Sequence, residues 1–329
     1  MLHHPPNSNH SRFLAGVVLV SVLLGVCAPP LSAESATLRA GGIYAVITDN
    51  EAWQEHVARY NGLAFLSRGE GYENIFHVNY GGFNLENIFD REREDARDVP
   101  QPQHMNFEPR NIPMKLRRLS ADTVELFQVA GPQWGIENRA RFRVREPYYL
   151  DIDFQCTPRQ SHAHKDFLGL FWANYVNAPT DGAIYFLGRA KPEAKMEWIR
   201  FITPGHAEQS TVLPEGSTIK TDFAPGYGKW LWSRFSENVF SYPFLYGIVK
   251  GQLFLLMFDR MPNLRLAHSP SGGGGTPAWD FQFIIPDYQV GKRYGFRARI
   301  AIKEFSGRDH VIREYERWSK QKVQLPGSR

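Results

Sequence analysis

The stretch "RARFRVREPYYLDIDF", Arg139 to Phe154, decides the fold class because every second side chain is apolar on both sides of its Glu-Pro turn. Such alternation predicts two strands, each with one buried face. If the strands form a hairpin, Arg143 can lie opposite Asp151. Arg141 can then lie opposite Asp153. A ladder of surface ion pairs explains these aspartates more simply than a role in glycoside hydrolysis.

Similar signals recur along the chain. Alternation returns in "YGFRARIAI", and fuller apolar runs predict strands covered on both faces. These segments are 294–302 for the alternation and 167–176, 183–187, 197–202 and 253–258 for the apolar runs. An aromatic content of 14% also favours strands. The prediction is a mainly-β protein, a single large two-sheet antiparallel sandwich of about fifteen strands.

Only two segments predict helices. "TDNEAWQEHVARYNG", residues 48–62, opens with a capping-box pattern and ends at a glycine. "RDHVIREYERWSK", residues 308–320, spaces its apolar side chains helically, with Asp309 as the cap. Two short helices therefore accompany the sandwich.

The N-terminus has the three parts of a secretory signal: Arg12, the apolar run 13–27, and small residues up to Ala33. Residues 1–33 are predicted to be a signal peptide and 34–329 a single β-sandwich domain. The domain would be periplasmic, on the cell surface or extracellular. An uncleaved anchor and lipidation of Cys27 are alternatives, although bulky Val26 disfavours the lipid. No segment of the mature chain is apolar for long enough to cross a membrane.

Charge and cysteine content limit the function further. With 38 basic and 34 acidic residues, the balance is too even to indicate a nucleic-acid partner. Cys156 is the only cysteine beyond the signal segment, so the domain has no internal disulfide. A buried thiol is a better expectation for it than a nucleophile.

Two stretches resemble a known family. "YNGLAFLSR" (60–68) and "YGGFNLENIFD" (80–90) are similar to the opening strands of galactose-mutarotase-like supersandwich proteins. "FWANYVNAPTDGAIYFLGR" and "PAWDFQFIIPDY" resemble secreted bacterial proteins of unassigned activity. Mutarotases carry an acid histidine before Phe-Asn-Leu, whereas only Phe83-Asn84-Leu85 matches here. The resemblance implies a fold and a carbohydrate ligand, not an active site.

The glycine run in "SPSGGGGTPAWDFQF", residues 269–283, is not a phosphate loop, since no lysine follows it and a strand begins after Pro277. A flexible loop flanked by His268 and Asp280 would suit a ligand lid. In the strand, Trp279 lies on one face, and Asp280 and Gln282 lie on the other. Aromatic rings and planar polar groups together are typical of sugar sites, although the aromatics can equally fill the core.

Three histidines and one glutamate join Asp280 as candidates for acid–base chemistry. "SHAHKDF" carries His162 and His164 on one side of a strand, and His206 lies in "TPGHAEQS". They can be metal ligands, acid–base groups or members of a polar loop. Glu86 lies in an amide-rich segment with Asn84.

The leading hypothesis is therefore an exported carbohydrate-active or carbohydrate-binding protein that needs no cofactor. Its reaction would be proton transfer in an epimerase, lyase or hydrolase. Non-catalytic glycan binding and a metal-dependent enzyme built on the His-x-His pair are the alternatives. The candidate catalytic residues are His162, His164, His206, Asp280 and Glu86, and the candidate substrate-binding residues are Asn84, Trp172, Asn174, Trp279, Gln282 and His268.

Overall fold

The computed structural model describes residue 1 and residues 35–92, 105–161, 166–272 and 275–325. The predicted signal peptide lies outside these ranges except for its first residue. Strand is by far the commonest regular structure in the described chain, which confirms the predicted mainly-β fold. The helices are α1 (Glu108–Asn111) and α2 (Arg308–Ser319). The strands up to the middle of the chain are β1 (Ser35–Ala40), β2 (Ile43–Thr48), β3 (Gly62–Ser67), β4 (Asn84–Phe89), β5 (Lys115–Arg118), β6 (Thr123–Gln128), β7 (Ile136–Arg145), β8 (Tyr149–Pro158) and β9 (Phe167–Ala173). The later strands are β10 (Ile184–Arg189), β11 (Glu197–Phe201), β12 (Thr211–Pro214), β13 (Phe235–Phe240), β14 (Phe244–Val249), β15 (Gln252–Phe258), β16 (Leu264–Ser269), β17 (Ala278–Pro286) and β18 (Tyr294–Glu304).

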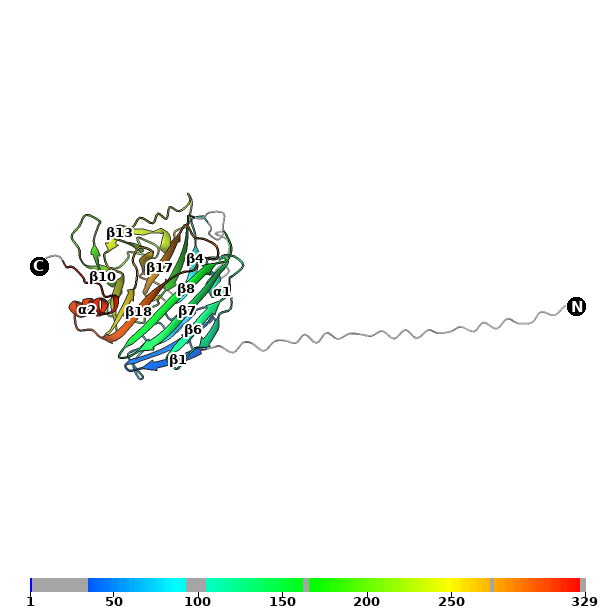
Figure 1. The fold of residues 1–329 in the computed structure, drawn as a ribbon, viewed down its shortest axis with the longest axis horizontal. Coiled ribbons are helices and arrows are strands. Elements are labelled where there is room, and N and C mark those ends of the chain that lie inside the picture. Colours follow the sequence, from blue (N-terminus) through cyan, green and yellow to red (C-terminus); the bar gives the residue numbers. More distant parts are fainter. Residues whose placement is uncertain (2–34, 93–104, 162–165, 273–274, 326–329) are drawn as a thin grey trace. The chain divides into compact units, whose positions relative to one another are not determined.

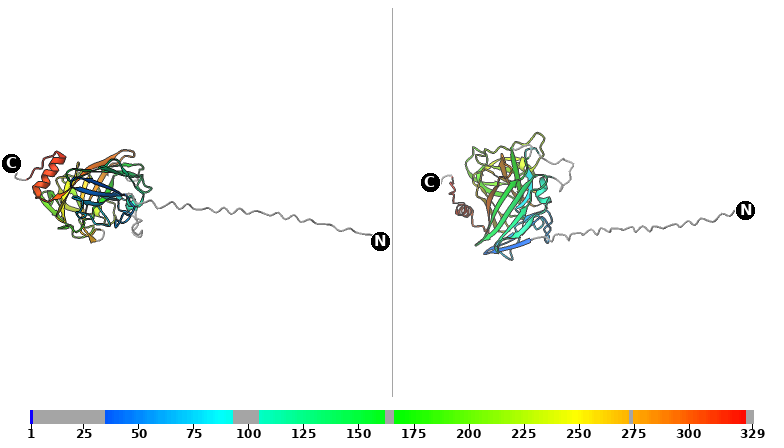
Figure 2. Two further views of the ribbon diagram at one scale, coloured as in Figure 1. Left: turned by 90° about the horizontal axis from the view of Figure 1, so that it is seen from below. Right: turned by 45° about the vertical axis from the view of Figure 1, so that its right-hand side comes forward.

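The strands form one small sheet and one large sheet. The small sheet has the order β1-β2-β3, and the large one runs β4-β9-β17-β16-β12-β13-β10-β14-β15-β18-β8-β7-β6-β5, with β11 paired to β10. Within the described residues, the pair β12 and β13 is parallel and the other named neighbours are antiparallel. Figure 1 shows β18, β8, β7 and β6 side by side. Two short turn-like 3-10 helices and α2 complete the domain, and Figure 2 shows α2 packed along one side of it.

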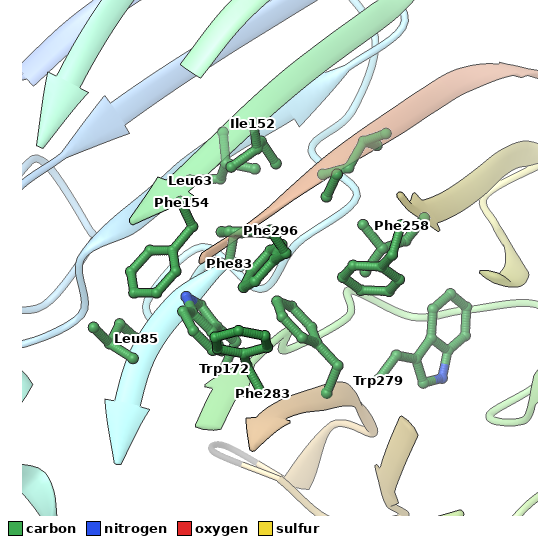
Figure 3. Packing of buried hydrophobic residues seen from close by; sticks show 14 of the residues in the cluster. Leu63, Phe83, Leu85, Ile152, Phe154, Trp172, Phe258, Trp279, Phe283 and Phe296 are labelled. Atoms are coloured by element: carbon green, nitrogen blue, oxygen red, sulfur yellow. The ribbon is translucent and has the colours of Figure 1, made fainter. Parts of the chain in front are cut away.

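The aromatic core lies between distant parts of the large sheet (Figure 3). Trp172 of β9 stacks on Phe281 of β17, with ring centroids 4.9 Å apart. Its edge meets Phe154 of β8, with a centroid distance of 4.7 Å. Phe258 of β15 also contacts Phe281, at 4.8 Å. Because β9 and β17 stand far from β8 and β15 in the sheet order, these contacts hold two layers together as a sandwich.

The hairpin that decides the fold class has the predicted register. Arg143 is opposite Asp151, and Arg141 is opposite Asp153. The ion pairs differ from the prediction, however. Arg141 pairs with Glu125 of β6 at 2.8 Å, and Arg143 pairs with an aspartate of the preceding loop. Arg141 and Arg143 therefore pair with acids of β6 and of the loop before it, while Arg145 pairs across the hairpin with Asp151 at 2.5 Å.

The predicted helix at residues 48–62 is wrong. Thr48 ends β2, and the following loop holds Gln54 and Arg59 in left-handed backbone conformations, which interrupt a helix. Asn50 explains the preference for a loop. Its buried side-chain amide donates hydrogen bonds to the carbonyl oxygens of Pro109 and Ile112, at 2.8 and 2.7 Å. Tertiary hydrogen bonds thus override the local capping pattern.

The C-terminal helix is confirmed as α2, which buries Val311 and Tyr315 against β14 and β15. Its start differs from the prediction, because Gly307 is the N-cap and no side chain caps the helix.

One predicted strand also differs in burial. In β11, Arg200 is exposed while Phe201 is buried, so only one face is covered. This strand pairs with β10 alone, away from the main path of the sheet.

We expect Trp172→Ala to lower the free energy of unfolding by about 3–5 kcal/mol, because removal of a buried indole leaves a cavity. Urea denaturation followed by circular dichroism measures the change. Trp318→Ala is the matched control, since Trp318 is only partly buried on α2. Equal losses in both variants would contradict the assignment of Trp172 to the core.

Candidate functional site

A cavity of about 220 Å³ lies on the far side of β4, β9 and β17 from the aromatic core. Side chains alternate along each strand, so residues between the core positions face this side. The loop before β13 and the α1 segment complete the walls. The lining residues are Tyr60, Glu86, Asn87, Phe107, Arg110, Tyr175, His206, Trp230, Leu231, Trp232, Ser269, Ser271, Gly272, Ala278 and Asp280.

Glu86 is placed in the cavity by an irregularity in β4. The pairing of β4 with β9 shifts register between Leu85 and Asn87, so Glu86 is the additional residue of a bulge. One carboxylate oxygen, Oε1, accepts hydrogen bonds from Arg110 Nη1 at 2.7 Å and from the Tyr175 hydroxyl at 2.8 Å. Nothing in the described part of the chain donates to Oε2. Glu86 is thus held by one oxygen and presents the other.

Arg110 is itself fixed on three sides. Its Nε donates to the carbonyl oxygen of Arg59 at 2.9 Å, and its guanidinium carbon lies 3.9 Å from the centre of the Tyr60 ring. Together with the 2.7 Å ion pair to Glu86, these contacts satisfy a nearly buried cation. Glu108 anchors the short α1 segment by accepting the main-chain N–H of Trp134 at 2.9 Å.

Asp280 of β17 also lines the cavity, in a contrasting environment. Its Oδ1 accepts the main-chain N–H of Asn174 at 2.9 Å, and its side chain is buried. Burial raises the pKa of Asp280 well above its usual range, although the Asn174 N–H opposes the shift, and the negative charge of Glu86 raises it further. The cavity therefore brings together an ion-paired carboxylate and a buried carboxyl group whose pKa is raised.

Tyr175 links these groups. Burial, followed by the negative charge of Glu86, raises the pKa of its hydroxyl well above the usual value. The hydroxyl therefore stays protonated and donates to Glu86. Tyr175 also contacts Tyr60 and Tyr80, with ring centroids 5.8 and 5.4 Å away.

An aromatic column forms another wall. Trp230 stacks on Trp232, with a centroid distance of 5.0 Å and an interplanar angle of 4°. Trp232 stacks in turn on Phe89 of β4 at 4.9 Å. The column fixes the Trp230 ring, which is only partly buried and lines the cavity.

Two polar groups add hydrogen-bonding capacity. Asn87 is buried, and its Nδ2 has no hydrogen-bond partner within the described residues. Buried donors are rarely left unpaired, so this amide suits a ligand oxygen. His206 is exposed, with Nδ1 2.9 Å from the Ser269 hydroxyl.

The structure therefore brings three of the predicted catalytic residues, Glu86, His206 and Asp280, to one cavity. His162 and His164 lie outside the described residues. Sequence reasoning missed Arg110, Tyr60, Tyr175 and Trp230, which come from separate segments. For Trp230, the aromatic run "YGKWLW" at 227–232 was an available signal.

The six predicted substrate-binding residues are not among those that line this cavity. Trp172 and Trp279 are 1% and 0% exposed and belong to the aromatic core. His268 is also fully buried, with Nε2 2.9 Å from the carbonyl oxygen of Gly182 and Nδ1 3.0 Å from the Thr203 hydroxyl. Its two ring nitrogens therefore both have partners within the fold.

The three predicted amides are buried too. Asn174 ties strands together, since its Nδ2 donates to the carbonyl oxygen of Trp279 and its Oδ1 accepts the Phe83 N–H, both at 2.8 Å. Gln282 donates to the Thr211 hydroxyl at 2.7 Å. Asn84 has no exposed surface. None of the three lines the cavity.

Two further kinds of feature are absent from the described residues. No group of three or more histidine, cysteine, aspartate or glutamate side chains there is arranged to hold a metal ion. No helix there has the length and apolar character needed to span a membrane.

We expect Asp280→Asn to raise the free energy of unfolding at pH 8. The folded-state pKa of Asp280 is raised, so its contribution to stability is fully present below the unfolded-state pKa and declines as pH rises toward the folded value. Asparagine resembles the neutral acid and can still accept the Asn174 N–H. Urea denaturation at pH 5 and pH 8 should show a smaller fall in stability for the variant than for wild type. An identical fall in both would mean that Asp280 is already ionised.

Comparisons with known proteins gave structural matches only. No family model and no curated protein matches the chain. One similar structure is a putative aldose 1-epimerase from Escherichia coli, with 10% identity over 83% of this chain and 100% of that one, at a TM-score of 0.49. Another is a galactose mutarotase related enzyme from Lactobacillus acidophilus, with 9% identity over 82% and 98% and a TM-score of 0.48. A third is an aldose epimerase homologue from Caenorhabditis elegans, with 11% identity over 84% and 100% and a TM-score of 0.45. These structures are of the galactose-mutarotase-like kind that the sequence resembles.

Proposed function

We propose that the chain is a carbohydrate-active protein that carries out proton transfer on a sugar bound in the cavity. The observation that carries the proposal is the pair of carboxyl groups, Glu86 and Asp280, in opposite environments of one cavity. Proteins assign acid and base roles to two carboxyl groups by placing them in environments that move their pKa values apart. His206 at the same cavity is a further acid–base candidate.

The contacts assign a role to each oxygen. Asp280 accepts the Asn174 N–H through Oδ1, which leaves Oδ2 to carry the proton. This proton would pass to the oxygen of the sugar C–O bond that breaks. Glu86 is held through Oε1, so Oε2 would take a proton from a sugar hydroxyl or from the carbon-bound position that reacts. Epimerase, lyase and hydrolase chemistry all use such a pair.

The remaining walls suit a sugar ring. The fixed ring of Trp230 can stack on the C–H face of a pyranose, as aromatic side chains do at sugar sites. The unpaired Nδ2 of Asn87 and the hydroxyls of Ser269 and Ser271 can bind sugar oxygens. A cavity of about 220 Å³ lies below the usual range for drug-sized ligands, which favours one ring over a long chain.

We also propose that the domain works outside the cytoplasm. The support is the sequence of residues 1–33, with its positive start, apolar run and small-residue end.

We expect the purified protein to bind a subset of a glycan array. Trp230→Ala should weaken that binding about tenfold, because the stacking surface is lost. Trp198→Ala is the matched control, since Trp198 is partly buried near α2 and should leave binding unchanged.

Turnover of the glycan bound best is then followed by proton NMR. Asp280→Asn and Glu86→Gln should each reduce turnover by about 10²- to 10⁴-fold while keeping the fold. Binding without product in the wild type would indicate a non-catalytic glycan-binding module. Binding to no glycan would remove the carbohydrate proposal.

A further inference from the structure

A second and larger cavity lies on the outer face of β7, β8 and β18, the strands that face the viewer in Figure 1. Its volume is about 510 Å³. Four arginines dominate its lining, and we call it the arginine groove. Its lining residues are Leu119, Thr123, Arg141, Arg143, Arg145, Asp151, Ile152, Asp153, Asp259, Arg297, Ala298, Trp318, Ser319 and Gln321. Glu86 and Asp280 belong to β4 and β17 and line the other cavity.

The four arginines share one mode of attachment, in which an acid contacts the Nε atom. The pairs are Arg141 with Glu125 at 2.8 Å, Arg143 with Asp122 at 2.8 Å, Arg145 with Asp151 at 2.5 Å and Arg297 with Asp259 at 3.1 Å. None of their terminal guanidinium nitrogens donates a hydrogen bond to any described residue. Each arginine is therefore held at its Nε atom, while its two terminal guanidinium nitrogens make no hydrogen bond to a described residue.

Two of the four acids, Glu125 and Asp259, are recessed beneath their arginines, whereas Asp122 is 37% exposed beside Arg143. The Glu125 side chain is 1% exposed, whereas Arg141 is 46% exposed. Asp259 is 15% exposed, whereas Arg297 is 71% exposed. At these two pairs, a molecule that approaches the face meets the guanidinium group before the acid.

The acids are also shared, so the arginines outnumber them. Glu125 pairs with Arg117, Arg139 and Arg141. Asp151 pairs with Arg145 and Arg299, and Asp259 pairs with Arg260 and Arg297. The face keeps an excess of positive charge that its own acids do not neutralise. A nearly even charge balance over the whole chain conceals this local excess.

We propose that the arginine groove binds an acidic polysaccharide through its carboxylate or sulfate groups. A guanidinium whose terminal nitrogens are unused presents a planar pair of donors that matches either anion. Arginines at alternate positions of β7 lie about 7 Å apart, so they can contact successive anionic groups of a polymer. The ligand and the strands both differ from those of the sugar cavity, so this site does not depend on the proposed reaction.

The aspartates of β8 favour a saccharide over a nucleic acid. Asp151 and Asp153 lie between the arginines of β7 and those of β18. A nucleic acid carries a closely spaced phosphate chain, which would meet these carboxylates. A polysaccharide also carries hydroxyl groups, which can donate hydrogen bonds to them. Trp318 also lines the groove and adds an aromatic face for a sugar ring.

Isothermal titration calorimetry of the whole protein tests the proposal with four probes: heparin, polygalacturonate, neutral dextran and single-stranded oligothymidylate. Binding of heparin or polygalacturonate is expected, weaker at 200 mM than at 50 mM salt, and dextran should not bind. The two acidic polymers separate sulfate from carboxylate recognition. Tighter binding of oligothymidylate, or binding of neither acidic polymer, would overturn the proposal.

The variant Arg143→Gln/Arg297→Gln should weaken the binding at least tenfold. Its matched control is Arg39→Gln/Arg200→Gln, which removes two exposed, ion-paired arginines elsewhere and causes the same change in net charge. The control should lose less than twofold, and equal losses would show attraction to net charge alone. Arg143→Lys/Arg297→Lys keeps charge but not the planar fork, so it should lose affinity several-fold even if the glutamine variant does not fold. Trp230→Ala should bind the acidic polymer normally, which separates this site from the sugar cavity.

Discussion

Alternation of side chains along β17 is the constraint on which the structure depends. Trp279, Phe281 and Phe283 point to the aromatic core, so Asp280 must point to the other side. A shift of one residue in the pairing of β17 would exchange these faces and place a carboxyl group among phenylalanine rings. The core thus fixes the register, and the register fixes the position of the acid. One face of β17 thus packs in the core, and the other face carries the acid that lines the cavity.

The strand pattern was predictable because it is local. Alternation in residues 139–154 indicated the hairpin and even its register, since one face had to be buried. The helix predicted for residues 48–62 was wrong because Asn50 makes its hydrogen bonds about sixty residues away, near Pro109. No local sequence pattern indicates these partners. The aromatic residues of β9 and β17 had two allowed interpretations. Only the three-dimensional arrangement decides that Trp172 and Trp279 are inside.

The candidate site was predictable only in part for the same reason. Glu86 and Asp280 stood out as isolated acids in uncharged surroundings. Arg110, which holds Glu86, lies on α1, and its sequence neighbours give no sign of the contact. The contrast between the two acids also depends on burial. A buried ion pair and a buried neutral acid both cost free energy of solvation, which the large apolar core can offset. The site is therefore maintained by a core on the opposite side of the same strands.

The order of the large sheet ends at β5, and this end has a consequence for behaviour at high concentration. β5 pairs with β6 on one side, and no further strand of the described sheet follows it. Its four residues are Lys115, Leu116, Arg117 and Arg118, of which the three cations are exposed. An unpaired strand edge is a template for pairing with another chain, and a short, cationic edge discourages such pairing by repulsion between like charges. The same basic character that borders the arginine groove would thus help to keep separate molecules from joining edge to edge into aggregates.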